Sequence, residues 1–217
     1  MSVKLISKVG LVVVVVVTGA ALVLGQEAKV VPLPKPQTEG GKPLMEALKA
    51  RKSTRAFSTK ALPPQVLSNL LWAANGVNRP DGRRTAPSAV NWQEIDVYVA
   101  TADGLYLFDA KAHALNQVLA EDVRAMTGGQ PFVKEAPVNL LFVADLARMG
   151  KGSAEDKNFY SATDTGFVSQ NVYLFCASEG LATVVRGGVD RAALAKKAGL
   201  RADQKIILAQ TVGYPKE

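Results

Sequence analysis

Three cationic side chains and two hydroxyls stand together in the run Arg51-Lys52-Ser53-Thr54-Arg55. A phosphate group needs its charge neutralised and needs short hydrogen bonds from hydroxyl or amide donors, and this pentapeptide supplies both. The same residues could instead form a solvated turn at the end of a helix, where the helix dipole favours cations. The run therefore predicts either an anion site or a charged helix terminus.

A second polar run, from Pro87 to Gln93, has the side chains needed to hold a flat ring. Ser88, Asn91 and Gln93 can hydrogen-bond the edge of a heteroaromatic ring on which donors and acceptors alternate. Pro87 and Ala89 leave room for a close approach to the face of the ring. The alternative is an ordinary junction between a loop and a strand.

A third candidate follows a short apolar run at 182–185, where Arg186 precedes Gly187 and Gly188. Glycines at the end of a buried strand let the backbone approach a flat ligand closely. The sequence has no Gly-x-Gly-x-x-Gly pattern between a strand and a helix, so it does not indicate a dinucleotide-binding fold.

The composition removes several other kinds of chemistry. Cys176 is the only cysteine, which excludes an internal disulfide and cysteine-based zinc sites, and His113 is the only histidine, which leaves almost nothing from which to build a His-rich metal site or a Ser-His-Asp triad. We expect Cys176 to be a small buried hydrophobe and His113 to be a surface or helix-terminal residue. The net charge of +7 is scattered along the chain, so it disfavours nucleic-acid binding and favours a small anionic ligand.

These runs need a scaffold, and the hydrophobic pattern predicts one of the α+β class. Helices are expected from Pro43 to near Arg51, after Pro63-Pro64 as far as Gly76, and over 112–126, 157–178 and 191–198. Strands are expected at 95–99, 104–108, 137–144, 182–185 and 205–212. The first two strands have the pattern of an antiparallel hairpin, so the central sheet should be mostly antiparallel and flanked by helices.

The N-terminal segment predicts export to the periplasm. Lys4 and Lys8 precede an apolar run at 9–24, and small residues allow cleavage after Gly25. The run is shorter than the roughly 20 residues that a membrane-spanning helix needs, although an uncleaved anchor is the alternative. Prolines and glycines beyond the run indicate a flexible tether. The expected domains are a signal peptide at 1–25, a tether at 26–42 and a folded unit at 43–217.

In this order along the chain, the three runs resemble the motifs of the FMN-dependent nitroreductase family, over about 43–215. In that family an Arg-Arg-Ser-x-Arg-like motif binds the phosphate and ribityl chain of FMN, and here Lys52 replaces the second arginine and keeps its charge. The family's Pro-Ser-x-x-Asn-x-Gln motif contacts the flavin of the other subunit of an obligate dimer. The run 82–88 is similar to the branch that contains the thiazole- and oxazole-forming dehydrogenases.

The resemblance implies a nitroreductase-like fold, a bound FMN and a homodimer whose interface contains the 157–178 helix. The implied cofactor-binding residues are Arg51, Lys52, Ser53, Arg55, Pro87, Ser88, Ala89, Asn91, Gln93, Arg186, Gly187 and Gly188. Among them, Arg55 is expected to stabilise the negative charge of the reduced flavin. No side chain is required as a catalytic acid or base, because N5 of the flavin carries the hydride.

We therefore expect an exported FMN-dependent oxidoreductase that acts on nitroaromatic, quinone-like or other electron-poor small molecules, or that oxidises an unknown substrate. NAD(P)H is not expected as its electron donor, since the donor would have to be present outside the cytoplasm. Two alternatives stay open. One is a flavin-binding electron-relay protein without turnover. The other is a structural dimer in which Lys52 and the C-terminal Lys216 do not suffice for flavin binding.

Overall fold

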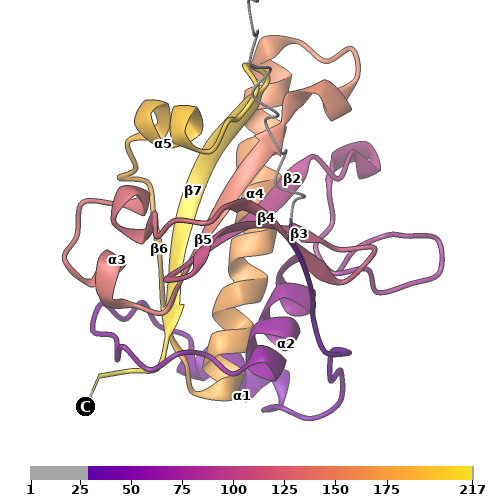
Figure 1. Cartoon of the computed structure of the whole chain (residues 1–217). Helices are drawn as coiled ribbons and strands as arrows, with labels where there is room; N and C mark the ends of the chain where they lie inside the picture. Colours follow the sequence, from indigo (N-terminus) through magenta and orange to yellow (C-terminus); the bar gives the residue numbers. More distant parts are fainter. Residues whose placement is uncertain (1–28, 217) are drawn as a thin grey trace, which may run out of the picture.

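The computed structural model describes residues 29–216 and contains a seven-stranded sheet (Figure 1). The strand order is β1-β4-β3-β2-β5-β7-β6, and every neighbouring pair is antiparallel. The strands are β1 (Val30–Pro32), β2 (Ile95–Thr101), β3 (Gly104–Asp109), β4 (Ala114–Leu119), β5 (Val138–Asp145), β6 (Ala182–Arg186) and β7 (Gln204–Gly213). The helices are α1 (Leu44–Ala50), α2 (Pro64–Asn75), α3 (Phe132–Glu135), α4 (Ala154–Glu179) and α5 (Arg191–Lys197). The expected α+β fold with a mostly antiparallel sheet is confirmed.

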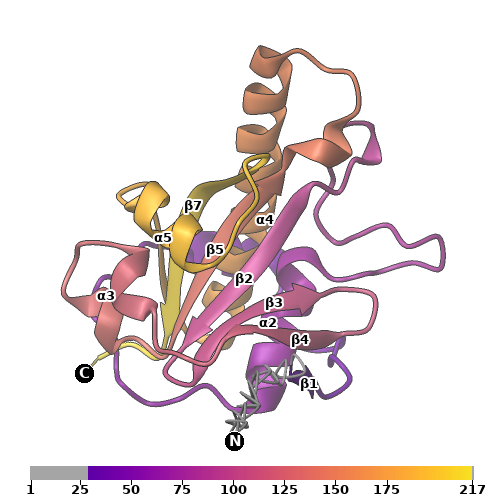
Figure 2. The ribbon, with the colours of Figure 1, turned by 45° about the horizontal axis from the view of Figure 1, so that its top comes forward.

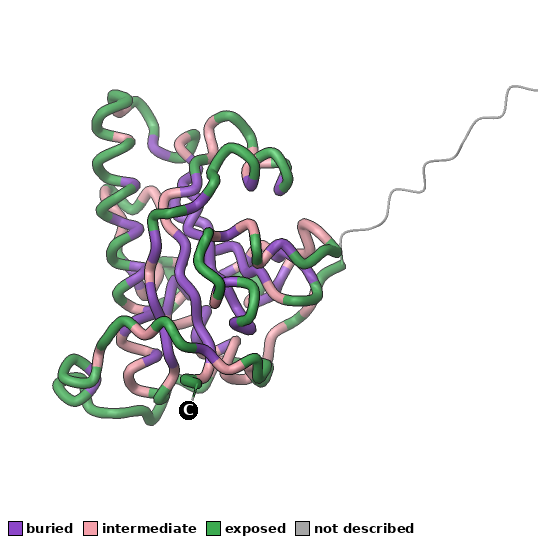
Figure 3. The backbone as a smooth tube through the Cα atoms, turned by 90° about the vertical axis from the view of Figure 1, so that its left-hand side faces the viewer, coloured by how far each residue is buried: buried purple, intermediate pink, exposed green. Residues whose placement is uncertain are grey.

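The sheet separates two hydrophobic cores. Strand β5 lies near its middle, and all eight residues of that strand are buried. Because side chains alternate across a strand, Leu140 and Phe142 face one core, whereas Leu141 and Val143 face the other. Helices α2 and α4 cover the first core and α5 covers the second (Figure 2). Figure 3 shows the result, a set of buried strands enclosed by helices whose outer sides are exposed.

The long helix α4 has strong signals at both ends. Ser153 Oγ accepts the Asp156 amide (3.0 Å) and Asp156 Oδ2 accepts the Ser153 amide (3.2 Å), which is a capping box. The helix stops at Gly180, whose φ of +69° is a conformation that glycine adopts without strain. The helix expected over 157–178 is confirmed and is slightly longer than expected.

The helix expected over 112–126 is wrong. Strand β4 and a 3₁₀ turn at 124–127 occupy this stretch. Asp109 accepts two backbone amides of the turn that follows it, and His113 takes a φ of +50°, so the chain reverses and β4 pairs with β3. The spacing of the apolar residues suits a helix, but β3 on one side and β1 on the other satisfy the backbone groups of an extended strand.

The chain before Pro43 is packed against the domain, and we call residues 30–42 the N-terminal strap. Its strand β1 pairs with β4, the amide of Gln37 donates to Asn69 Oδ1 (2.9 Å), and that of Lys42 donates to Ser178 Oγ (2.8 Å). Proline lacks an amide donor, but an edge strand tolerates it and its carbonyl still accepts hydrogen bonds. The expected tether at 26–42 is therefore wrong for residues 30–42, and the folded part begins at β1 instead of Pro43.

The signal peptide expected at 1–25 lies outside the described residues, as do residues 26–28. Among the helices of residues 29–216, none has both the length and the apolar character needed to cross a membrane.

His113 is a half-buried partner of the strap and not a surface or helix-terminal residue. Its Nε2 lies 2.7 Å from Ser68 Oγ, and the Ser68 hydroxyl donates to the carbonyl of Pro34 (2.6 Å). Burial lowers the pKa of His113, which favours the neutral imidazole. The neutral ring can then donate from Nε2 to Ser68, so one buried hydroxyl joins α2, the strap and the turn before β4.

We predict that Ser68→Ala destabilises the protein by about 1–3 kcal/mol, because it leaves half-buried hydrogen-bonding groups of the strap and of His113 without their partner. Denaturant unfolding monitored by circular dichroism measures the change. Ser58→Ala is the control, since Ser58 Oγ accepts only an exposed turn amide from Lys60. An equal, small effect of both variants would contradict a stabilising role for the strap contact.

Candidate functional site

The run 51–55 follows the end of α1 and lies along strand β6, where the amide of Thr54 donates to the carbonyl of Thr183 (2.9 Å). Tyr173 of α4 holds this run in place. Its hydroxyl lies 2.7 Å from Ser53 Oγ and accepts the amide of Val185 (3.0 Å), and the guanidinium of Arg51 lies over its ring, 5.3 Å from the centroid. The run is therefore attached to both the helix and the strand.

A cavity of about 660 Å³ lies beside this run, and we call it the lysine cavity. Four of its lining residues are lysines, and none is an aspartate or a glutamate: Lys42, Lys49, Lys52 and Lys216. Thr54 and Tyr173 add hydroxyl groups to the lining. Like charges without an acid among them repel one another, so this cavity favours an anion.

Arg55 and the glycine pair after β6 are exposed. Among the described residues, Arg55 has no hydrogen-bonding or ion-pair partner for its side chain. A Cβ atom on Gly188 would meet nothing within 4 Å, and one on Gly187 would meet only Leu208 Cδ2 at 3.9 Å. Neither glycine has a positive φ, so this chain's own packing does not require glycine at either position. The pair leaves an open edge where a flat ligand can approach the backbone.

The side chain of Arg186 is turned into the protein. Its three nitrogens donate to neutral acceptors: Nε to Thr211 Oγ1 (3.2 Å), Nη1 to the Thr127 carbonyl (2.6 Å) and Nη2 to Asn139 Oδ1 (3.0 Å). Burial lowers the pKa of Arg186 to about 10. Its guanidinium therefore anchors the end of β6, and a contact between this residue and a ligand would have to use its backbone.

The second run, Pro87 to Gln93, has an unusual backbone. Val90, Asn91 and Gln93 have φ values of +52°, +58° and +50°. A β-branched residue in this region is a genuine outlier, and such strain persists only where the surroundings hold it. The amide of Ala89 donates to Asp164 Oδ2 of α4 (2.8 Å), and the side chain of Val90 is 82% exposed. The run is thus held rigidly with an apolar side chain in solvent.

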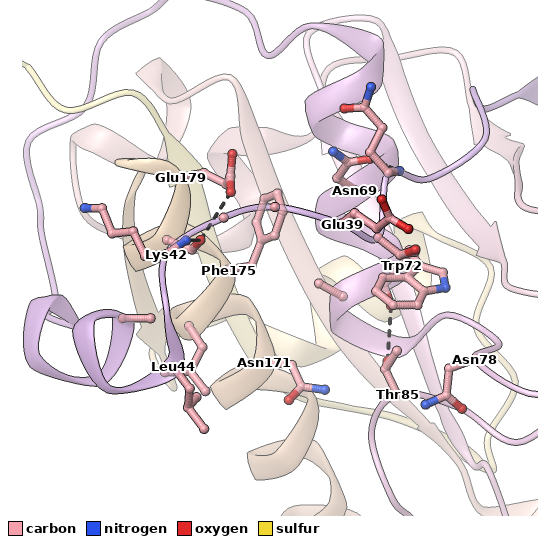
Figure 4. Close-up of a pocket in the computed structure, with 18 residues that line it drawn as sticks. Glu39, Lys42, Leu44, Asn69, Trp72, Asn78, Thr85, Asn171, Phe175 and Glu179 are labelled. Atoms are coloured by element: carbon pink, nitrogen blue, oxygen red, sulfur yellow. Dashed lines mark hydrogen bonds between the residues drawn. The ribbon is translucent and has the colours of Figure 1, made fainter.

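The two tryptophans differ in their surroundings. Trp92, inside the second run, packs edge-on against Tyr160 of α4, with 5.7 Å between the ring centroids. Trp72 is half-buried and lines a cavity of about 550 Å³ between the strap, α1, α2 and α4 (Figure 4). Phe175, Asn69 and Asn171 line the same cavity, which contains none of the predicted site residues.

The runs 51–55 and 87–93 contact α4 at different positions along its axis. Tyr173 anchors one and Asp164 anchors the other, and these residues are separated by about 13 Å along the helix axis. Within the described part of the chain, no hydrogen bond joins 51–55 to 87–93. One chain therefore brings 51–55 together with the end of β6, whereas 87–93 forms a separate, partly exposed surface.

Sequence reasoning missed the role of Tyr173. This residue lies among apolar neighbours on the buried side of α4, a pattern that predicts core packing. Its hydroxyl reaches Ser53 and Val185 only because α4 packs against β6. No local signal identifies such a contact.

The fold and the basic site define an α+β protein suited to an anionic ligand. The model of the nitroreductase family matches residues 48–214. A candidate nitroreductase from Ralstonia eutropha JMP134, known from its crystal structure, is 46% identical with a TM-score of 0.83, covering 87% of this chain and 90% of that one. A candidate nitroreductase of Methanocaldococcus jannaschii is 32% identical over 154 residues, 66% of this chain and 78% of its own. This chain belongs to the nitroreductase family, as its motifs predict.

A more distant structure shares the fold. The NADPH:FMN oxidoreductase of Vibrio harveyi, in complex with NAD⁺, has a TM-score of 0.62 at 20% identity, covering 80% of this chain and 69% of that one. The family membership supports the expectation that this protein is an enzyme, an oxidoreductase of the FMN-dependent kind.

Proposed function

We propose that this protein binds FMN and uses it for hydride transfer. The observation that carries the proposal is the lysine cavity beside Arg51 and Ser53, in a chain of the nitroreductase family. A bound phosphate would relieve the repulsion among four lysines and would accept charge-assisted hydrogen bonds from them. The same position follows the helix end where the family motif predicts the phosphate.

The residues present fit FMN in three respects. Arg51, Lys52 and Ser53 would hold the phosphate and the ribityl chain. The open edge at Gly187 and Gly188 leaves room for a flat ring, since a Cβ there would meet almost nothing in this chain. Arg55, exposed and unpaired among the described residues, is free to stabilise negative charge on the ring. When bound, FMN supplies hydride acceptance and donation at N5.

The substrate that we propose is an electron-poor small molecule of the nitroaromatic or quinone-like class, or an unidentified compound that the flavin oxidises. The names of two relatives, both candidate nitroreductases, support the first class. His113 contacts the strap and not the site, and burial raises the pKa of the Cys176 thiol. Neither of these two side chains is therefore suited to covalent catalysis, and the residues of the proposed site contribute positioning and charge.

We also propose a homodimer, in which 87–93 completes the flavin site of a second copy. Phe159 and Phe167 of α4 are 63% and 43% exposed, which is unfavourable in water. Gly166 lies beside Phe167 on the exposed side of the helix, and a Cβ on it would meet nothing within 4 Å. A glycine in the middle of a helix costs about 0.5–1 kcal/mol relative to alanine, so close approach of another helix is the physical reason to keep it.

We predict that Arg51→Ala weakens FMN binding about 10- to 100-fold, because a hydrogen bond to a charged group contributes about 1.5–3 kcal/mol. Quenching of flavin fluorescence during titration of the protein measures the dissociation constant, and the absorption spectrum of the purified protein shows whether flavin is retained. Arg79→Ala is the control, since Arg79 contacts only the neighbouring Asn78 in an exposed loop. Equal FMN affinity in both variants would show that 51–55 is only a charged turn at the end of a helix and does not bind the phosphate.

We predict that Phe167→Asp shifts the protein from dimer to monomer, because it places a charge on the apolar side of α4. Light scattering after size-exclusion chromatography, at micromolar concentration, measures the mass. Ala192→Asp, on the exposed first turn of α5, is the control and should remain dimeric. A wild-type protein that is a stable monomer under these conditions would remove the dimer proposal.

We further propose that the protein is exported and that NAD(P)H is not its physiological donor, on the evidence of residues 1–25 alone. Fractionation of cells that make the untagged protein should place a shortened chain in the periplasm. In stopped-flow experiments, NADH and NADPH should reduce the flavin slowly. Full-length protein in the cytosol, with flavin reduced within milliseconds by either nucleotide, would overturn both parts.

A further inference from the structure

Glu94 is a buried acid whose carboxylate group accepts no hydrogen bond from the described residues. Its side chain has no exposed surface, and neither of its carboxylate oxygens has a hydrogen-bond partner in the part of the chain that the structure describes. The residue lies between the strained run 87–93 and strand β2, and its carbonyl accepts the amide of Asp145 (2.9 Å), so its backbone is fixed. An ionised carboxylate in such a place is costly, because nothing replaces the water that it has lost.

A second acid, Asp164 of α4, is near enough to act on Glu94 both through its charge and through a hydrogen bond between the two side chains. Asp164 is only 2% exposed, and its Oδ2 accepts the amide of Ala89 (2.8 Å). Neither carboxylate forms an ion pair within the described residues, because the nearby Arg148 is already engaged by Asp96 (2.7 Å) and Asp145 (3.3 Å). When two carboxyl groups lie together in a buried site, ionisation of both has a high free-energy cost.

We propose that Glu94 holds a proton that it donates in a hydrogen bond to Asp164, and that this proton positions the run 87–93 through the bond from Ala89 to Asp164. A proton on Glu94 gives its carboxyl group a donor that can point at Asp164. It also leaves the charge of Asp164 available for the Ala89 amide. Loss of the proton would place two negative charges together, and outward movement of Asp164 would relieve the repulsion at the expense of the Ala89 bond.

Burial is the main cause that raises the pKa of Glu94, to about 7, and Asp164 adds to it. The backbone amide of Glu94 and Arg148 act in the opposite direction. Arg84 is the other cation facing the pair, and its Nε donates to Gln93 (3.1 Å). The pKa of Glu94 lies above its ordinary value, so the stability that the proton contributes is complete at low pH and disappears as the pH rises through about 7.

The proton on Glu94 affects the strained residues first, because Ala89 immediately precedes Val90 and Asn91. If 87–93 completes a flavin site, as proposed above, then Glu94 is a positioning residue for that site and not a catalytic one. The proton itself does not depend on flavin. It is a property of the packing between α4 and the start of β2, so it can be tested separately.

Trp92 reports directly on this run. The chain has two tryptophans, so the full-length protein labelled with 5-fluorotryptophan gives two ¹⁹F resonances, which Trp72→Phe assigns. We expect the Trp92 resonance to shift with a midpoint near pH 7 and the Trp72 resonance to remain constant. Glu94→Gln should abolish the shift and keep Trp92 at its low-pH position, because the amide is uncharged and can still donate to Asp164.

Two further variants keep the test decisive. Glu155→Gln removes an exposed carboxylate from the first turn of α4 and should leave the titration unchanged. Asp164→Asn removes the neighbouring charge and should lower the midpoint, even if Glu94→Gln fails to fold. Infrared spectra of the wild type should contain a protonated-carboxyl band at about pH 5.5 that is lost by about pH 8.5.

A Trp92 resonance that does not titrate, or one that titrates equally in Glu94→Gln, would overturn the proposal. The same outcome follows if the wild type lacks the carboxyl band. Both measurements work with or without FMN. A protein that binds no flavin but titrates at Trp92 would therefore contradict the proposed function alone.

Discussion

Both halves of the candidate site depend on the packing of α4 across the sheet. Polar groups on the buried side of this helix hold each half: Tyr173 contacts Ser53 and the amide of Val185, and Asp164 accepts the amide of Ala89. Between them, the hydroxyl of Ser169 donates to Gln210 Oε1 of β7 (2.8 Å), which fixes the helix against the sheet. A displacement of α4 by one turn, about 5.4 Å, would break all of these contacts together.

A buried network of hydrogen bonds holds the end of β6 in place. Arg186 donates to Thr127, Asn139 and Thr211, which belong to three different parts of the chain. A buried guanidinium without a carboxylate is costly, and the neutral acceptors offset that cost only if their geometry is kept. The open edge at Gly187 therefore directly follows a residue, Arg186, whose position is fixed. A ligand placed at this edge would meet a preformed surface.

Several features are unfavourable for a chain on its own. They include the left-handed backbone at Val90, the exposed phenylalanines of α4 and the buried pair of carboxyl groups beneath 87–93. All of them lie on or beside α4, towards its N-terminal half. Strain, exposed apolar area and an uncompensated buried acid each raise the free energy of the isolated fold. In the proposed dimer the run 87–93 and the exposed phenylalanines would form the contact surface, where a second copy and a flavin could offset their cost, and the proposed proton on Glu94 would lower the cost of the buried acids.

The sequence by itself determined the antiparallel α+β class, the long helix ending at Gly180 and the three runs with functional side chains, because these depend on local periodicity, capping and residue type. It was wrong at 112–126 and at 30–42, where partner strands distant in the chain satisfy the backbone. Only the tertiary structure turned Arg186 inward, brought Tyr173 to Ser53 and placed Glu94 beside Asp164. Each of these contacts joins residues far apart in sequence, and local propensity contains no information about which of them will meet.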